Sequence, residues 1–333
     1  MTSPNGAWAE VRAPSTTALV WTGGTGLEVH DRAAPQAGAG EAVFNVALAG
    51  ICGSDLHGYR GHPGPRRPPL VLGHEAVGGV EGRDGRFVLF PLFTCGACRS
   101  CLAGAENLCE RRELLGLNRD GVFAGALSVP DSSLVEVPSA VPDRLAVLTE
   151  PLAVAVAALR QDGVSPGDRV LVIGAGPIGL LAVYAARAAG ADVSVAEPLA
   201  GRRQFAQQLG ASQVLERPED AEAEAFDLVL DAAGFAATVA SAMAAVRRGG
   251  QVTVLGLGDE TVTLPLANAV RRGVRIRGHF AYLRRDFAAA LELLRADPVA
   301  DAWLDVVPLA HGADAFRALV DEPDRVTKVL LAP

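Results

Sequence analysis

Four cysteines lie close together in the sequence, at spacings that suit a single metal ion. Cys95, Cys98, Cys101 and Cys109 are separated by two, two and seven residues. Two-residue spacers let successive sulfurs turn back toward one ion, and four thiolates complete a closed tetrahedral shell around Zn²⁺. A closed shell leaves no position for a substrate, so the sequence predicts a structural zinc site. Four unliganded buried thiols are the alternative interpretation.

The fifth cysteine, Cys52, begins a second set of residues that can bind metal. It opens the segment Cys52-Gly53-Ser54-Asp55-Leu56-His57, and Gly73-His74-Glu75 follows. A thiolate, an imidazole and a carboxylate, with one position left for water, describe a catalytic zinc site. A lone Cys and a lone His could instead pair in a hydrophobic core. The motifs that accompany this pair favour the metal site.

A glycine-rich turn follows the predicted strand Val170–Ile173. It consists of Gly174-Ala175-Gly176-Pro177-Ile178-Gly179 and opens an apolar helix. The first Gly permits a tight turn, the second lets a pyrophosphate approach the backbone, and the third lets helix and strand pack closely. The helix N-terminus favours phosphate as well. The sequence therefore predicts a dinucleotide site, with a glycine-rich turn in a nucleotide-free domain as the alternative.

An acidic residue, Glu197, ends the next predicted strand. At this distance from the turn, an acid is expected to bind the ribose hydroxyls of NAD and to repel the 2′-phosphate of NADP. Arg202 lies about one helical turn further on and could accommodate such a phosphate. Because no basic residue replaces the acid, we expect a preference for NAD.

The elements around these motifs change character near Asp168. Before this residue, short apolar runs alternate with Gly and Pro, which predicts a small barrel or sandwich. After it, strands alternate with helices, which predicts an α/β, doubly wound parallel sheet. Two helices and a last strand are expected at the end of the chain. The predicted strands of the first part are Thr17–Trp21, Ala42–Leu48, Ala76–Val80, Phe87–Phe90 and Ala126–Val129.

Composition limits the function classes. The chain has 333 residues, which favours two domains. A net charge of −8 gives no reason to expect nucleic acid or a membrane as partner. The segment Met1–Ala13 shows no secretory signal, and no apolar run approaches the length of a membrane span. Clustered cysteines without a secretory signal favour a cytoplasmic protein.

Taken together, these motifs resemble the zinc-dependent medium-chain dehydrogenase/reductase family. Thr149-Glu150-Pro151-Leu152 belongs to the same ordered set, and the resemblance covers about Thr17 to Leu331. Within the family, the chain is most similar to sorbitol, galactitol-phosphate and 2-deoxy-scyllo-inosamine dehydrogenases. The resemblance implies a GroES-like barrel-type catalytic domain (1–153) with a structural zinc lobe (91–112), a Rossmann NAD-binding domain (154–280) and a return to the catalytic domain (281–333).

The resemblance also assigns the metal ligands. Cys52 and His74 are expected to bind the catalytic zinc. Glu75 is expected to complete the shell, and Glu150 either replaces it or holds a zinc-bound water. Asp55 is expected to orient His74, as metal-bound imidazoles usually require.

The remaining roles concern protons and cofactor. Ser54 is expected to take the proton of the substrate hydroxyl and His57 to pass it to solvent, although His57 could be an ordinary surface histidine. Lys328 is expected to contact the cofactor pyrophosphate. Arg66 and Arg67 are expected to form a solvated pair, with a contact to a substrate phosphate as the weaker alternative.

These roles imply an NAD-dependent alcohol or polyol dehydrogenase with two zinc ions per chain. Its partner is a small-molecule alcohol or ketone, and a homo-oligomer, dimer or tetramer, is expected. A zinc-free quinone or enoyl reductase on the same scaffold is one alternative. A non-catalytic, zinc-stabilised binding protein is the other.

Overall fold

The computed structural model describes residues 15–62 and 64–333, and the chain divides into two compact units. Unit 1 comprises the chain up to Glu150 together with Leu283–Pro333, and unit 2 comprises Pro151–Tyr282. The segment Met1–Ala13, on which the expectation of no secretory signal rests, lies outside the described residues. Among the described residues, no helix has the length and apolar character that a membrane span needs.

Unit 1 is built mainly from short antiparallel strands, as the sequence predicts. The strands are β1 (Ser15–Gly23), β2 (Gly26–Ala33), β3 (Glu41–Gly50), β4 (Leu70–Val71), β5 (Glu75–Val80), β6 (Arg83–Leu89), β7 (Leu92–Phe93), β8 (Glu113–Leu114), β9 (Ala126–Pro130), β10 (Leu134–Glu136), β17 (Leu304–Pro308) and β18 (Lys328–Ala332). The main sheet has the order β10-β6-β5-β3-β18-β17, and β9 pairs with β3. Strand β3 buries every second residue over Ala42, Phe44 and Val46, the pattern of a strand with one face on the core.

Short helices complete unit 1. They are α1 (Gly53–Tyr59), α2 (Arg99–Leu102), α3 (Asp143–Ala146), α9 (Arg284–Ala296) and α10 (Gly312–Asp321), with single 3₁₀ turns η1 (Glu106–Leu108), η2 (Asp131–Ser133) and η4 (Leu309–His311). Phe316 of α10 packs against Tyr59 and Phe123, with ring centroids 5.5 and 6.0 Å apart. These rings belong to the hydrophobic core of unit 1, which therefore draws on both ends of the chain.

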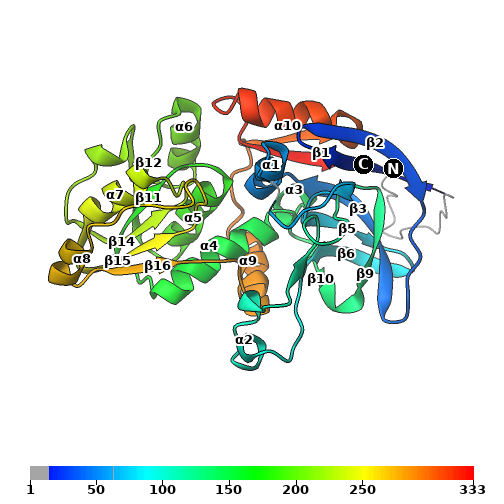
Figure 1. Cartoon of the computed structure of the whole chain (residues 1–333), viewed down its shortest axis with the longest axis horizontal. Helices are drawn as coiled ribbons and strands as arrows, with labels where there is room; N and C mark the ends of the chain where they lie inside the picture. The colour runs from blue at the N-terminus through cyan, green and yellow to red at the C-terminus, as the bar shows by residue number, and fades with distance from the viewer. Residues whose placement is uncertain (1–14, 63) are drawn as a thin grey trace. The chain divides into compact units, whose positions relative to one another are not determined.

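Unit 2 contains a six-stranded, entirely parallel sheet (Figure 1), which confirms the predicted doubly wound domain. The strand order is β13-β12-β11-β14-β15-β16. The strands are β11 (Arg169–Ile173), β12 (Asp192–Ala196), β13 (Gln213–Leu215), β14 (Phe226–Asp231), β15 (Val246–Val254) and β16 (Arg275–Gly278). The helices are α4 (Thr149–Asp162), α5 (Pro177–Ala188), α6 (Ala200–Gln208), α7 (Ala236–Ala245) and α8 (Leu266–Arg272), with the 3₁₀ turn η3 (Pro218–Asp220). Val170–Ile173 are fully buried, as expected of a central strand covered on both faces.

Two elements differ from the sequence-based expectation. Only two helices and a last strand were expected at the end of the chain, but a further strand, β17, follows α9 and pairs in parallel with β18. Most of β17 is exposed, so its sequence lacks the apolar run that identifies a buried strand. The helix α4 was not expected either, and its first two residues, Thr149 and Glu150, belong to unit 1.

Candidate active site

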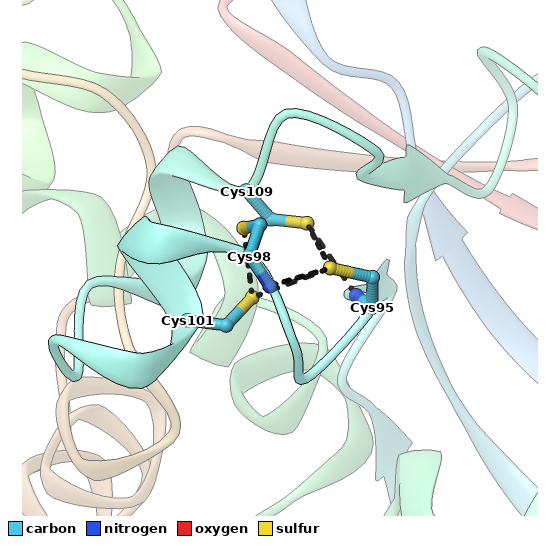
Figure 2. A group of neighbouring side chains, drawn as sticks. All are labelled: Cys95, Cys98, Cys101 and Cys109. Atoms are coloured by element: carbon cyan, nitrogen blue, oxygen red, sulfur yellow. Dashed lines mark hydrogen bonds between the residues drawn. The ribbon is translucent and has the colours of Figure 1, made fainter.

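The four cysteines of the predicted lobe converge on one point. Cys95 Sγ lies 3.9 Å from Cys101 Sγ and 3.5 Å from Cys109 Sγ, and Cys98 Sγ lies 3.5 Å from Cys101 Sγ (Figure 2). A tetrahedron with Zn–S bonds of about 2.3 Å has S–S edges of about 3.8 Å. All four thiols are free, with no disulfide among them. The donor set therefore fits one zinc ion with a closed shell.

The protonation of these thiols favours a cation as well. The backbone N–H of Ala97 lowers the pKa of Cys95 to about 5, while burial and the neighbouring thiols of Cys98 and Cys109 raise the pKa of Cys101 to about 12. Four sulfurs this close cannot all carry a negative charge without a positive ion between them. A bound metal removes this conflict because it displaces the remaining protons.

The second metal-binding group forms where strands from both ends of the chain meet. Strand β3 ends at Gly50, and Cys52 immediately precedes α1. In the antiparallel pairing of β3 with β5, Gly50 lies opposite Glu75. A Cβ on Gly50 would approach Glu75 Oε2 to 2.1 Å, so only glycine fits at this position. The strand register thus places Glu75 and His74 beside Cys52.

The geometry of this second group fits a metal ion. Ligand atoms of Cys52, His74 and Glu75 all lie within 4.8 Å of one another. His74 and Glu75 are buried, and among the described residues His74 Nδ1 and Glu75 Oε1 have no hydrogen-bond partner. A buried polar atom without a partner is unfavourable, and a cation beside Glu75 Oε1 would satisfy that atom, whereas His74 Nδ1 is the ring nitrogen on the side of Asp55. Burial and the charges of Glu75 and Asp55 raise the pKa of Cys52 to about 11, so a nearby cation is needed to hold it as thiolate.

Asp55 and Arg66 form a buried ion pair beside this group. Arg66 Nη2 donates to Asp55 Oδ1 at 3.2 Å, and Asp55 Oδ2 accepts from the backbone N–H of Cys52 at 3.2 Å. His74 Nδ1 lies 3.9 Å from Asp55 Oδ1. The expectation of a solvated Arg66 was wrong, because its side chain is only 4% exposed. Arg67 is exposed as expected.

Lys328 occupies a different environment from the one expected. Its Nζ donates to Glu75 Oε2 and, at 2.8 Å, to the carbonyl oxygen of Ile51, and the residue is 1% exposed. The pairing of β18 with β3 places it there, since Leu330 lies opposite Gly50. The structure therefore assigns its ammonium to neutralising Glu75 within unit 1, in place of the predicted pyrophosphate contact. The Glu75 oxygen that Lys328 does not bind is the one without a hydrogen-bond partner.

Ser54 and His57, the predicted proton carriers, both lie on α1. Ser54 Oγ accepts a hydrogen bond from Arg66 Nη2 at 3.3 Å. The His57 residue is exposed at the surface of unit 1. Partial desolvation of its imidazole and the charges of Arg60, His62 and Arg66 lower its pKa. A neutral imidazole at the surface of unit 1 can accept a proton and release it to water.

Glu150 is not part of the three-residue group. It is buried, in the first turn of α4, and Pro151 follows it directly. The ligand set that comes together among the described residues is Cys52, His74 and Glu75. Contact of Glu150 with a zinc-bound water remains a prediction.

The glycine-rich turn of unit 2 has the geometry that phosphate binding requires. Gly174 directly follows β11 and has a φ of 89°, and a Cβ on Gly179 would lie 1.8 Å from the carbonyl oxygen of Gly174. Both positions therefore require glycine. Gly176 precedes Pro177, the first residue of α5, and no atom within 4 Å would obstruct a Cβ there. The turn thus leaves open space in front of a helix N-terminus, where anions bind.

Glu197 is tied to this turn. Its Oε2 accepts from the N–H of Ala175 at 2.7 Å, and its Oε1 accepts from the N–H of Leu199 at 3.0 Å. A carboxylate has about four acceptor positions, so two stay available for ribose hydroxyls. Arg203 Nη1 donates to the carbonyl oxygens of Glu197 and Pro198, and Arg202 lies beside it on α6. Sequence reasoning did not identify the contact of Glu197 with the turn, which depends on the parallel pairing of β11 and β12.

Two protein families match this chain. The alcohol dehydrogenase GroES-like domain matches residues 38–139, and the zinc-binding dehydrogenase family matches residues 177–296. D-xylulose reductase A of Aspergillus oryzae is 32% identical over 320 residues, with 87% of this chain and 88% of the reductase covered. The chain belongs to the zinc-dependent medium-chain alcohol dehydrogenase family. It is therefore an oxidoreductase of the zinc-binding dehydrogenase class, as the sequence predicts.

Solved structures agree with this assignment. Acetophenone reductase from Geotrichum candidum, in complex with NAD, is 27% identical to this dehydrogenase with a TM-score of 0.88, covering 98% of this chain and 99% of that one. A zinc-binding dehydrogenase from Sinorhizobium meliloti bound to NADP is also 27% identical, with a TM-score of 0.88 and coverage of 96% and 99%. The predicted combination of a GroES-like domain with a Rossmann domain is confirmed.

Proposed function

We propose that this dehydrogenase interconverts a secondary alcohol and its ketone, with NAD as the hydride carrier and a polyol, cyclitol or sugar-like molecule as substrate. The observation that carries the proposal is the open donor set of Cys52, His74 and Glu75. Three protein ligands leave a position for a substrate oxygen, unlike the closed four-sulfur site. A bound zinc would supply a Lewis acid that lowers the pKa of a hydroxyl beside it, and NAD would accept the hydride.

The residues of α1 would handle the proton. Ser54 Oγ accepts one hydrogen bond from Arg66, which fixes its orientation and leaves a second lone pair for the hydroxyl of the substrate. His57 lies three residues further on the same helix and reaches solvent. We expect Ser54 to accept the substrate's proton while it passes its own hydroxyl proton on toward His57, which delivers it to water. The lowered pKa of His57 keeps it neutral, and thus able to accept a proton, near pH 7.

The similarity to D-xylulose reductase supports a polyhydroxylated substrate, because the compound in that relative's name, D-xylulose, is a polyhydroxylated ketone. The decisive experiment is NADH formation at 340 nm with a panel of polyols, cyclitols and amino alcohols. Activity that disappears in Cys52→Ser supports the proposal. Reduction of quinones or enoyl substrates with unchanged rates in Cys52→Ser would replace it by the zinc-free reductase alternative.

Preference for NAD over NADP is part of the proposal. The buried carboxylate of Glu197 lies at the turn, so a 2′-phosphate would bring two negative groups together. Relatives of similar fold are known with either cofactor, so the cofactor preference of this chain must be inferred from its own residues. We expect wild-type kcat/KM to favour NAD by more than about tenfold and Glu197→Ser to shift the ratio toward NADP. Equal use of both cofactors by the wild type would contradict this assignment.

We also propose a cytoplasmic homo-oligomer whose domains comprise residues 1–153 with 281–333 and residues 154–280. Free clustered thiols favour a reducing compartment. Strand β16 is an edge of its sheet, and Leu266, Val270 and Ile276 on α8 and β16 are exposed apolar residues. Sedimentation equilibrium tests this part: Val270→Glu should weaken the oligomer, and a wild-type monomer at micromolar concentration would rule it out.

A further inference from the structure

Unit 1 contains a pocket that none of the roles above uses. Its volume is about 390 Å³, and it is lined by Trp21, Gly23, Gly24, Gly58, Gly61, Arg66, Arg67 and Pro68. Pockets for small ligands start near 300 Å³, so this one can hold a group of several atoms. Four glycines among the lining residues expose backbone, and the Trp21 indole is turned to its own hairpin, where Nε1 donates to the carbonyl oxygen of Gly24 at 2.8 Å.

The charge of this pocket is positive. Two guanidinium groups line it, and none of the described residues that line it carries a carboxylate. Arg66 is paired with the buried Asp55, but within the described part of the chain Arg67 forms no ion pair. Arg67 Nη1 donates to the carbonyl oxygens of Gly64 and Arg66 at 3.1 and 2.8 Å, which holds the exposed side chain in place without neutralising it. A charged group fixed by neutral carbonyls is prepared to bind an anion.

The pocket and the proton-carrying residue Ser54 share one neighbour, Arg66. The same guanidinium that lines it, that of Arg66, donates to Ser54 Oγ at 3.3 Å and to Asp55 Oδ1 at 3.2 Å. Its Nε donates to the carbonyl oxygen of Gly116 at 3.1 Å, so hydrogen bonds on two sides hold the guanidinium in place. A substrate whose hydroxyl lies at Ser54 could therefore extend a charged group toward Arg66 and Arg67.

We infer that this pocket binds the anionic group, a carboxylate or a phosphate, of a polyhydroxylated substrate. The inference rests on the proposed function and narrows its substrate class from neutral polyols to sugar acids or sugar phosphates. Arg67 would be a specificity-determining residue, because its exposed and unpaired guanidinium can form a bidentate contact with either anion. Arg66 would border both the anion and Ser54.

The test compares substrates that share secondary hydroxyls and differ in charge. Initial rates of NADH formation are measured with D-gluconate, sorbitol 6-phosphate and sorbitol, on wild type, Arg67→Gln, Arg67→Lys and Arg83→Gln. Arg83 is a matched control, because it is an exposed arginine of unit 1 that does not line the pocket. We expect wild type and Arg83→Gln to favour one or both anions over sorbitol by about tenfold or more in kcat/KM. Arg67→Gln should remove that preference through KM, and Arg67→Lys should retain part of it. The preferred anion distinguishes carboxylate from phosphate.

Failure of this inference differs from failure of the proposed function. Oxidation of sorbitol at least as efficiently as both anions, or an anion preference that Arg67→Gln leaves intact, would overturn the inference and leave the alcohol dehydrogenase standing. If no alcohol is oxidised, the proposed function fails. Calorimetric titration of the wild type and Arg67→Gln with D-gluconate and sorbitol 6-phosphate then tests whether the pocket binds anions. Binding that Arg67→Gln weakens about tenfold supports the anion site, and equal or absent binding refutes it.

Discussion

The two cysteine-containing clusters of unit 1 are built in opposite ways. The four-sulfur lobe takes all its donors from one stretch, residues 95–109, and the backbone N–H groups of Cys95 and Cys98 point at its sulfurs. The group of Cys52, His74 and Glu75 takes its donors from the end of β3 and the start of β5, and charged side chains surround it. A closed site can be encoded locally, whereas an open site needs the tertiary fold to supply compensating charges.

The largest effect is expected when the thiolate of the open group is removed. In Cys52→Ser we expect kcat/KM to fall by at least about a thousandfold, because the Lewis acid contributes several kcal/mol to the reaction. Zinc content, measured by elemental analysis, should drop from two ions to one per chain while the thermal midpoint changes little. A variant that keeps both ions would mean that Cys52 is not a ligand.

Removing a sulfur from the lobe should have the converse effect. In Cys109→Ser, whose cysteine is fully buried, we expect loss of one zinc and about 3 kcal/mol of stability, or roughly 6–12 °C in the thermal midpoint. The kcat measured well below that midpoint should stay within severalfold of the wild type. Calorimetry and zinc analysis check the result. An unchanged midpoint would show that the lobe does not depend on metal.

A smaller effect, on zinc affinity at the open site, is expected when Glu75 is replaced. Replacing its carboxylate in Glu75→Gln should weaken zinc binding at the open site about ten- to a hundredfold, a range typical of groups that support a metal. The variant also leaves the buried ammonium of Lys328 without its negative partner. Zinc release to a chromogenic chelator is the measurement, and the double variant Glu75→Gln/Lys328→Met separates loss of the ligand from loss of the ion pair. Unchanged release kinetics would remove Glu75 from the ligand set.

The smallest effect is expected for Glu150→Gln. Because Glu150 lies outside the three-residue group, zinc release from this variant should match the wild type, and kcat should fall less than tenfold. Loss of zinc comparable to that in Glu75→Gln would instead make Glu150 the direct ligand. The two glutamates are thus distinguished by metal affinity rather than by activity.

Most of the features that were predicted correctly from the sequence depend on local motifs. Cysteine spacing identified the lobe, and the succession of strand, glycine turn and helix identified the parallel sheet, because both depend on neighbours in the chain. The buried state of Arg66 and the pairing of Lys328 with Glu75 were not predicted. Both contacts depend on sheet and loop positions far apart in sequence, and one sequence gives no direct measure of such pairings.

Strand β18 has a consequence for how this protein matures during synthesis. Residues 328–332 pair with β3, and the ammonium that neutralises Glu75 arrives with them. A ribosome that has completed β3, β5 and the whole of unit 2 has not yet supplied this strand. Unit 2 is contiguous and can fold as it emerges, but unit 1 must wait for β18. The open metal group should therefore reach its final charge balance only once β18 has emerged, and a chain cut before Lys328 should combine a folded nucleotide domain with an incomplete catalytic centre.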